Sequence, residues 1–163
     1  MNALKRLSRR VVEKAAAQGR SVGTAESLTG GLIASSLAGI PGASRVLLGG
    51  IVSYDPGVKR LLLDVPQEVL DGPGVVSAPC ALQMAMGAKD RLGADIAVSA
   101  TGLAGPGGGT AQTPVGTVFL AVAGGRGVRA EEHHFSGGRQ AVRRKAARTA
   151  LQMIADELES TEG

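Results

Sequence analysis

The chain turns from a strand-like to a helix-like pattern within the stretch Thr24-Ala25-Glu26-Ser27-Leu28-Thr29-Gly30-Gly31. Residues Val22–Glu26 read as a short strand, and from Leu32 onward apolar residues recur at helical spacing. A strand that passes directly into a helix is typical of an α/β sheet, whose ligands bind beyond the carboxyl ends of the parallel strands. The stretch therefore predicts a hydroxyl group, that of Ser27, at a strand end beside a helix N-terminus.

Four more strands are predicted by apolar and β-branched runs. They cover residues 46–53, 96–101, 115–123 and 128–135, and a glycine-rich turn joins the last two as a hairpin. Helical patterns run over about residues 2–17, from a Ser77 cap to Leu92, and over about residues 138–159. This order predicts an α/β sheet that is parallel in its first half and contains an antiparallel element in its second.

Length and cysteine content favour one cytoplasmic domain over residues 1–163. A chain of 163 residues is most simply one domain and can bury roughly 70% of its unfolded surface. Cys80 is the only cysteine, so an intrachain disulfide is excluded, and the N-terminus lacks the apolar core of a signal peptide. No apolar run approaches the roughly 18 residues that a membrane helix needs. We therefore expect no membrane partner.

A cluster of basic residues lies near the end of the chain. Its members are Arg139, Arg143, Arg144, Lys145 and Arg148, and the net charge of the chain is +4. With one Tyr, two Phe and no Trp, the chain has little on which to stack single-stranded bases. We expect a small anionic ligand and no stable binding of nucleic acid. A solvated helix face is the common role of such a cluster, and Arg139, at the expected helix start, is best placed to reach an anion.

Tyr54 and Lys59 follow the second predicted strand. Asp55 is a good N-cap and Pro56 a good first helical residue, which makes Tyr54 and Lys59 the two partners of a hydrophobic staple. We therefore expect the phenol and the amine to touch. Burial and the helix dipole should lower the pKa of Lys59 from its usual value of about 10.4 toward that of a useful base. Ser27, Lys59 and Tyr54 together are the parts of a metal-independent acyl-transfer site.

Two of these features also have simpler interpretations. Serine at a strand-to-helix junction is often only a helix cap, which leaves the role of Ser27 open. Gly30 and Gly31 can leave backbone N–H groups free at a helix start for an oxyanion or phosphate, or can serve only for tight helix packing.

The run Gly102 to Gly109 is too long and glycine-rich for an ordinary turn, and it follows a strand. A binding loop is the better interpretation, with backbone contacts to a phosphate or an amide. It is not a P-loop, because no Lys-Ser/Thr follows, and the strand after Pro114 excludes a dinucleotide fingerprint.

Other reactive side chains fit structural roles. His133 and His134 point to opposite faces of an edge-like strand, so a solvated surface is their expected place. Cys80 fits a small core residue better than a nucleophile. No His, Cys and carboxylate set has zinc spacing, so we expect neither a metal nor a cofactor.

Six motifs occur in order along nearly the whole chain. They are Thr24-Ala25-Glu26-Ser27-Leu28-Thr29-Gly30-Gly31, Tyr54-x4-Lys59, Gly74-Val75-Val76-Ser77, Thr101-Gly102-Leu103-Ala104-Gly105-Pro106-Gly107-Gly108-Gly109, Pro114-Val115-Gly116-Thr117-Val118 and Phe135-Ser136-Gly137-Gly138-Arg139. With these motifs the chain resembles the CinA carboxyl-terminal domain family, whose stand-alone members are nicotinamide mononucleotide amidases.

The resemblance implies a fold, a reaction and a site. The fold is a three-layer α/β/α sandwich on a mixed, mainly parallel five-stranded sheet, and the reaction converts nicotinamide mononucleotide to nicotinic acid mononucleotide and ammonia in pyridine nucleotide salvage. Ser27 is implied as the nucleophile, Lys59 as its base and Tyr54 as a supporting proton relay. The expected substrate-binding residues are Thr29, Gly30, Gly31, Thr101, Gly102, Gly105, Gly107 and Arg139. A homo-oligomer is also expected, with a dimer favoured.

The chain departs from the family pattern where Gly138 replaces a common Asp before Arg139, which removes a carboxylate that could orient this arginine. Leu28, in place of a common Cys, should alter only packing. A second class of function is a non-catalytic nucleotide- or partner-binding module linked to competence or recombination, because some relatives are fused to a nucleotide-hydrolysing domain. The presence of Ser27, Tyr54 and Lys59 favours the enzyme.

Overall fold

The computed structural model describes residues 1–160, which form one five-stranded sheet with helices on both faces. The strands are β1 (Val22–Glu26), β2 (Leu47–Val52), β3 (Ile96–Gly102), β4 (Thr117–Gly124) and β5 (Gly127–His134). The helices are α1 (Ala3–Gln18), α2 (Leu32–Ala38), α3 (Pro56–Leu63), α4 (Gln67–Asp71), α5 (Ala78–Leu92) and α6 (Arg139–Ser160), with a 3₁₀ turn at Ala43–Arg45.

The strand order in the sheet is β2-β1-β3-β4-β5. Strand β1 pairs in parallel with β2 and β3, whereas β4 is antiparallel to both β3 and β5. This confirms the predicted parallel first half and the hairpin at the end. The last residue of β1, Glu26, is level with Val52 and Ala100, so the chain leaves all three parallel strands at the same edge of the sheet.

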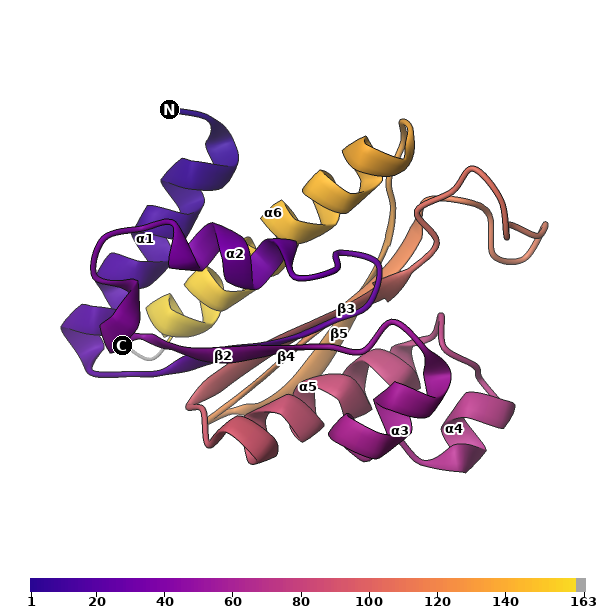
Figure 1. Cartoon of the computed structure of the whole chain (residues 1–163), viewed down its shortest axis with the longest axis horizontal. Coiled ribbons are helices and arrows are strands. Elements are labelled where there is room, and N and C mark those ends of the chain that lie inside the picture. The colour runs from indigo at the N-terminus through magenta and orange to yellow at the C-terminus, as the bar shows by residue number, and fades with distance from the viewer. Residues whose placement is uncertain (161–163) are drawn as a thin grey trace.

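The helices form two outer layers (Figure 1). Helices α1, α2 and α6 cover one face, and α3, α4 and α5 cover the other. The larger buried cluster lies under α1, α2 and α6 and includes Val11, Leu37 and Leu151. On the opposite face Met84 and Cys80 are fully buried, so the expected core position of Cys80 is confirmed. The three-layer α/β/α sandwich is therefore present.

Local sequence signals set the predicted helix starts. The Asp55 carboxylate accepts a hydrogen bond from the Gly57 N–H at 2.8 Å, with Pro56 as the first residue of α3, and the Ser77 hydroxyl accepts one from Cys80 at 3.2 Å. Helix α4 was not expected, since a single turn of five residues is too short to show a helical period. Within residues 1–160 no helix is both long and apolar enough to cross a membrane.

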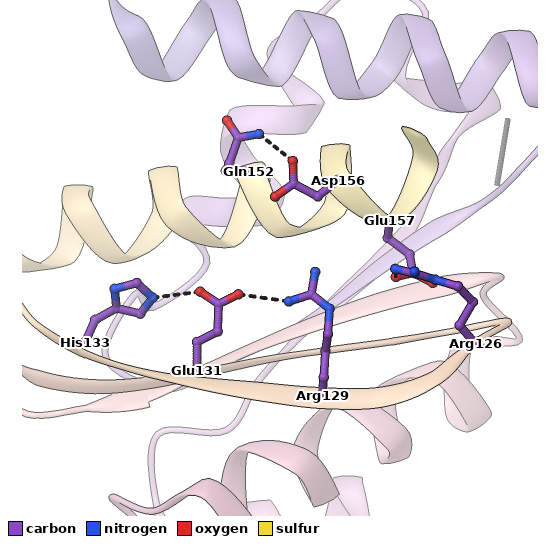
Figure 2. Close-up of polar contacts among 7 residues, drawn as sticks. All are labelled: Arg126, Arg129, Glu131, His133, Gln152, Asp156 and Glu157. Atoms are coloured by element: carbon purple, nitrogen blue, oxygen red, sulfur yellow. Dashed lines mark hydrogen bonds and ion pairs between the residues drawn. The ribbon is translucent and has the colours of Figure 1, made fainter. Parts of the chain in front are cut away.

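Strand β5 forms one edge of the sheet. Figure 2 shows Glu131 between His133 and Arg129, and all three side chains are turned toward α6. Partial burial would raise the pKa of Glu131, but the hydrogen bonds with His133 and Arg129 outweigh it and hold this pKa below its ordinary value. His134 pairs instead with Glu132. The solvated position expected for both histidines is found for His134, which is exposed, whereas His133 is partly buried on the side that faces α6.

Candidate active site

A pocket of about 270 Å³ opens where the parallel strands end. Its lining residues come from the loops after β1 and β2, from α3, from the segment before α5, from the end of β3 and the loop after it, and from the start of α6. They are Ser27, Leu28, Tyr54, Lys59, Val75, Val76, Thr101, Gly102, Leu103, Ala104, Gly105, Gly107 and Arg139. A larger hollow between α1 and α6, about 420 Å³, is lined by residues such as Arg6, Arg148 and Thr149. It holds neither Ser27 nor Lys59, so we place the active site in the smaller pocket.

Lys59 and Ser27 are in direct contact. The Lys59 Nζ lies 2.9 Å from the Ser27 Oγ, 2.6 Å from the Ser53 carbonyl oxygen and 3.2 Å from the Tyr54 carbonyl oxygen. A neutral amine has two N–H donors and one lone pair. If the two carbonyls take the donors, the lone pair is left facing the serine hydroxyl, which is the geometry of a general base.

The surroundings of Lys59 favour the neutral amine. The residue is only 1% exposed, although lysine is rarely buried so completely. Burial lowers the pKa of Lys59 from its ordinary value, and the charges of Cys80 and Asp55 act in the opposite direction. The pKa of Cys80 is raised by burial, against the pull of Lys59.

Lys59 hydrogen-bonds to the backbone carbonyl of Tyr54, whereas the Tyr54 hydroxyl has another partner. This hydroxyl accepts a hydrogen bond from Arg139 Nη2 at 2.7 Å, and Arg139 Nη1 donates to the Gly105 carbonyl at 2.8 Å. The phenol and the amine are expected to touch, but the phenol hydrogen-bonds to Arg139, and the amine is bound to Ser27 and to two backbone carbonyls. The contacts with Tyr54 and Gly105 orient Arg139 in the absence of a carboxylate at position 138.

The start of α2 is not free to bind an anion. The Glu26 carboxylate is fully buried, and it accepts hydrogen bonds from the N–H groups of Gly31 (3.2 Å), Ile33 (2.9 Å) and Ala34 (3.0 Å). The Gly30 N–H donates to the Ser27 carbonyl. The open N–H groups expected at Gly30 and Gly31 are thus already bound, because a carboxylate of the protein occupies this helix terminus.

The predicted binding residues divide into two groups. Thr101, Gly102, Gly105, Gly107 and Arg139 line the pocket, whereas Thr29, Gly30 and Gly31 are not among its lining residues. The hydroxyl of Thr101 donates to the Val75 carbonyl at 2.7 Å and so ties the strand end to the segment before α5. Thr29 is buried beside the pocket, with its carbonyl bound to Arg143.

Four residues that build the site could not be assigned to it from the sequence. Val75 and Val76 line the pocket, and their motif was visible only as part of the family pattern. Glu26 is the last residue of a predicted strand, and a glutamate at the end of a buried strand indicates a carboxylate that needs hydrogen-bond partners inside the protein. Arg143 was one member of a basic cluster and holds the loop of Ser27 from 115 positions away. Within residues 1–160, no group of three or more His, Cys, Asp or Glu side chains could hold a metal ion.

Comparisons with known proteins show which family this chain is similar to. A family model described as the CinA C-terminal domain matches residues 4–158. A CinA-like protein of Geotalea uraniireducens is 50% identical over 125 residues, which are 77% of this chain and 30% of that protein. A CinA-like protein of Anaeromyxobacter sp. is 47% identical over 144 residues, which are 88% of this chain and 35% of that protein. The chain thus spans about a third of the length of these curated relatives.

Solved structures extend the match to the whole fold. The crystal structure of competence/damage inducible protein CihA from Agrobacterium tumefaciens has a TM-score of 0.94 at 43% identity and covers 98% of this chain and 97% of that chain. A competence-damaged protein (CinA) superfamily protein from Klebsiella pneumoniae has a TM-score of 0.93 at 33% identity and covers 98% and 99%.

Proposed function

Because the chain belongs to the CinA C-terminal domain family, we propose that it is an amidase that converts nicotinamide mononucleotide to nicotinic acid mononucleotide and ammonia. The observation that supports this most is the buried amine of Lys59, 2.9 Å from the hydroxyl of Ser27. A serine with an adjacent lysine base is sufficient for acyl transfer.

In the proposed mechanism Ser27 Oγ attacks the carboxamide carbon while its proton passes to Lys59 Nζ. The tetrahedral intermediate collapses as Lys59 returns this proton to the amide nitrogen, so that the C–N bond breaks and ammonia leaves. A water molecule then attacks the acyl-enzyme and gives a proton to Lys59, and the ester bond to Ser27 breaks as Lys59 passes this proton to Ser27 Oγ. The net reaction consumes one water and one amide and yields one acid and one ammonia.

We assign recognition of the substrate phosphate to the mouth of the pocket. Arg139 lies there beside the glycine loop, and its guanidinium can donate two parallel hydrogen bonds to a phosphate. The amide end would then face Ser27. We further propose that the protein acts in the cytoplasm and as a homo-oligomer.

The direct test is ammonia release by the purified chain from nicotinamide mononucleotide, with nicotinamide and glutamine as controls. We expect release from the mononucleotide alone, and the same rate after treatment with a metal chelator. Absence of ammonia would favour the alternative, a non-catalytic nucleotide- or partner-binding module. Binding of the mononucleotide to Ser27→Ala, measured by calorimetry, separates nucleotide binding from partner binding in that case.

A further inference from the structure

We propose that Arg143 is a positioning residue that holds the loop of Ser27 so that the backbone N–H of Leu28 can donate a hydrogen bond to the substrate oxygen. This inference rests on the proposed function, in which a negative charge develops on the substrate oxygen when Ser27 attacks. Donors aimed at that charge before the reaction begins are the largest single contribution in many acyl-transfer enzymes.

Arg143 binds the nucleophile loop with two of its nitrogens. Its Nε donates to the Leu28 carbonyl at 2.9 Å and its Nη2 to the Thr29 carbonyl at 3.1 Å. The remaining Nη1 donates to Gln140 at 2.7 Å, which holds the guanidinium plane against α6. Arg143 lies in the first turns of α6, a helix of 22 residues packed on β3 and β4, so the loop is fastened to a rigid element.

These contacts determine where the N–H groups point. In a planar trans peptide, the carbonyl of one residue and the N–H of the next point in opposite directions. Because Arg143 holds the Thr29 carbonyl, it fixes the direction of the Gly30 N–H in the same peptide. The Gly30 N–H donates to the Ser27 carbonyl at 3.1 Å, and this contact fixes the Leu28 N–H, which points in the opposite direction from that carbonyl.

The Leu28 N–H is available for a ligand. Leu28 is 3% exposed, yet its N–H has no acceptor among the residues that the structure describes. Buried backbone donors are nearly always paired, so an unpaired one beside the nucleophile indicates an acceptor that arrives with the substrate. Leu28 lines the pocket together with Ser27.

The test compares Arg143→Ala and Arg143→Lys with the wild type. Arg144→Ala is the matched control, since Arg144 is the next residue of α6, is exposed and does not line the pocket. We expect Arg143→Ala to lower kcat by about a hundredfold while KM stays within about twofold of the wild-type value. Arg143→Lys should recover only part of the loss, because an ammonium cannot match the geometry of a guanidinium fork.

Added guanidinium ion, far below denaturing concentration, should raise the kcat of Arg143→Ala and leave Arg144→Ala unchanged. A purely structural role of Arg143 would not respond in this way. Thermal unfolding of each variant shows whether it folds. If Arg143→Ala does not fold, Arg143→Lys takes its place: a lowered kcat of this variant supports the positioning role, and an unchanged kcat overturns it.

A second measurement does not depend on the substrate. A fluorophosphonate forms a bond from its phosphorus to Ser27 Oγ and releases fluoride, with the serine proton passing to Lys59, and its anionic transition state uses the same Leu28 N–H donor. We expect Arg143→Ala to slow this labelling as it slows kcat.

The wild type could be labelled by the fluorophosphonate and yet release no ammonia from the mononucleotide. Slower labelling of Arg143→Ala than of the wild type would then uphold the positioning role and refute the proposed substrate. Equal labelling and equal kcat in wild type and Arg143→Ala would overturn the positioning role and leave the amidase proposal standing. If Ser27 of the wild type reacts neither with the mononucleotide nor with the fluorophosphonate, the amidase proposal and the positioning role are both refuted.

Discussion

The hydroxyl of Tyr54 is bound to Nη2 of Arg139, 85 positions away in the sequence, at 2.7 Å. This contact joins the loop after β2 to the start of α6, and both residues line the pocket. We therefore expect the phenol to act with Arg139 in binding the substrate. A change at Tyr54 should then affect KM, whereas loss of a proton relay at Lys59 would affect kcat.

Tyr54→Phe should raise KM for the mononucleotide and leave kcat nearly unchanged, as should Arg139→Ala, because both changes act on the group that meets the phosphate. In a double-mutant cycle the two changes should be non-additive, with a coupling energy of about 0.5–3 kcal/mol, as for residues in contact. The measurements are steady-state kinetics of the two single variants and the double variant. A loss of about a hundredfold in kcat for Tyr54→Phe would instead support a proton relay.

Ser27→Ala and Lys59→Met should each lower kcat by at least about a hundredfold, and the double variant should be little worse, since nucleophile and base act as one unit. Their stabilities should differ. Lys59→Met leaves the carbonyls of Ser53 and Tyr54 without their donor, at a cost of about 1–3 kcal/mol for each group left unsatisfied. Urea unfolding measures the difference, and a Ser27→Ala variant with normal turnover would show that Ser27 is only a cap.

Activity should rise with pH as Lys59 loses its proton, with an inflection below the ordinary lysine pKa of about 10.4. Burial sets this fall in pKa, whereas the negative charge of Asp55 opposes it. Asp55→Asn keeps an N-cap side chain but removes the charge, so the acid limb of the pH–rate profile should move to lower pH.

The control is Asp64→Asn, at the other end of α3, which should leave the profile in place. A shift to higher pH in Asp55→Asn would contradict the assignment of Lys59 as the base. Since the unfolded chain binds the Lys59 proton more tightly than the folded chain, stability should also increase with pH between the lowered and the ordinary pKa.

Gly87→Ala should destabilise the protein, although alanine favours a helix interior by about 1 kcal/mol. A Cβ on Gly87 of α5 would lie 2.1 Å from the carbonyl oxygen of Leu63, the last residue of α3. Forcing the two helices apart should cost about 1–3 kcal/mol and move Lys59 relative to Ser27. Thermal unfolding and kcat are both measured, with Gly125→Ala as control, because a Cβ there meets nothing within 4 Å. Unchanged kcat in Gly87→Ala would show that α3 tolerates the shift.

The sequence was most informative where the determinants are local. The caps at Asp55 and Ser77 lie within three residues of the groups they bind, so their patterns could be recognised without knowing the fold. Contacts between distant segments could not be read in this way. Nothing near Arg143 in the sequence points to the loop of Ser27, and Glu26 could be recognised as the partner of the α2 N-terminus only once the strand and helix were in place.

Lys59 holds two backbone carbonyls as well as the hydroxyl of Ser27, and this has a consequence for how such sequences evolve. A descendant that had lost the reaction would still be under selection to keep the lysine, because the ends of β2 and α3 depend on it for folding. The Ser27 side chain makes a hydrogen bond only to Lys59 within residues 1–160, so other residues could replace this serine at little cost to folding. Among homologues the serine is therefore the more diagnostic marker of a working enzyme.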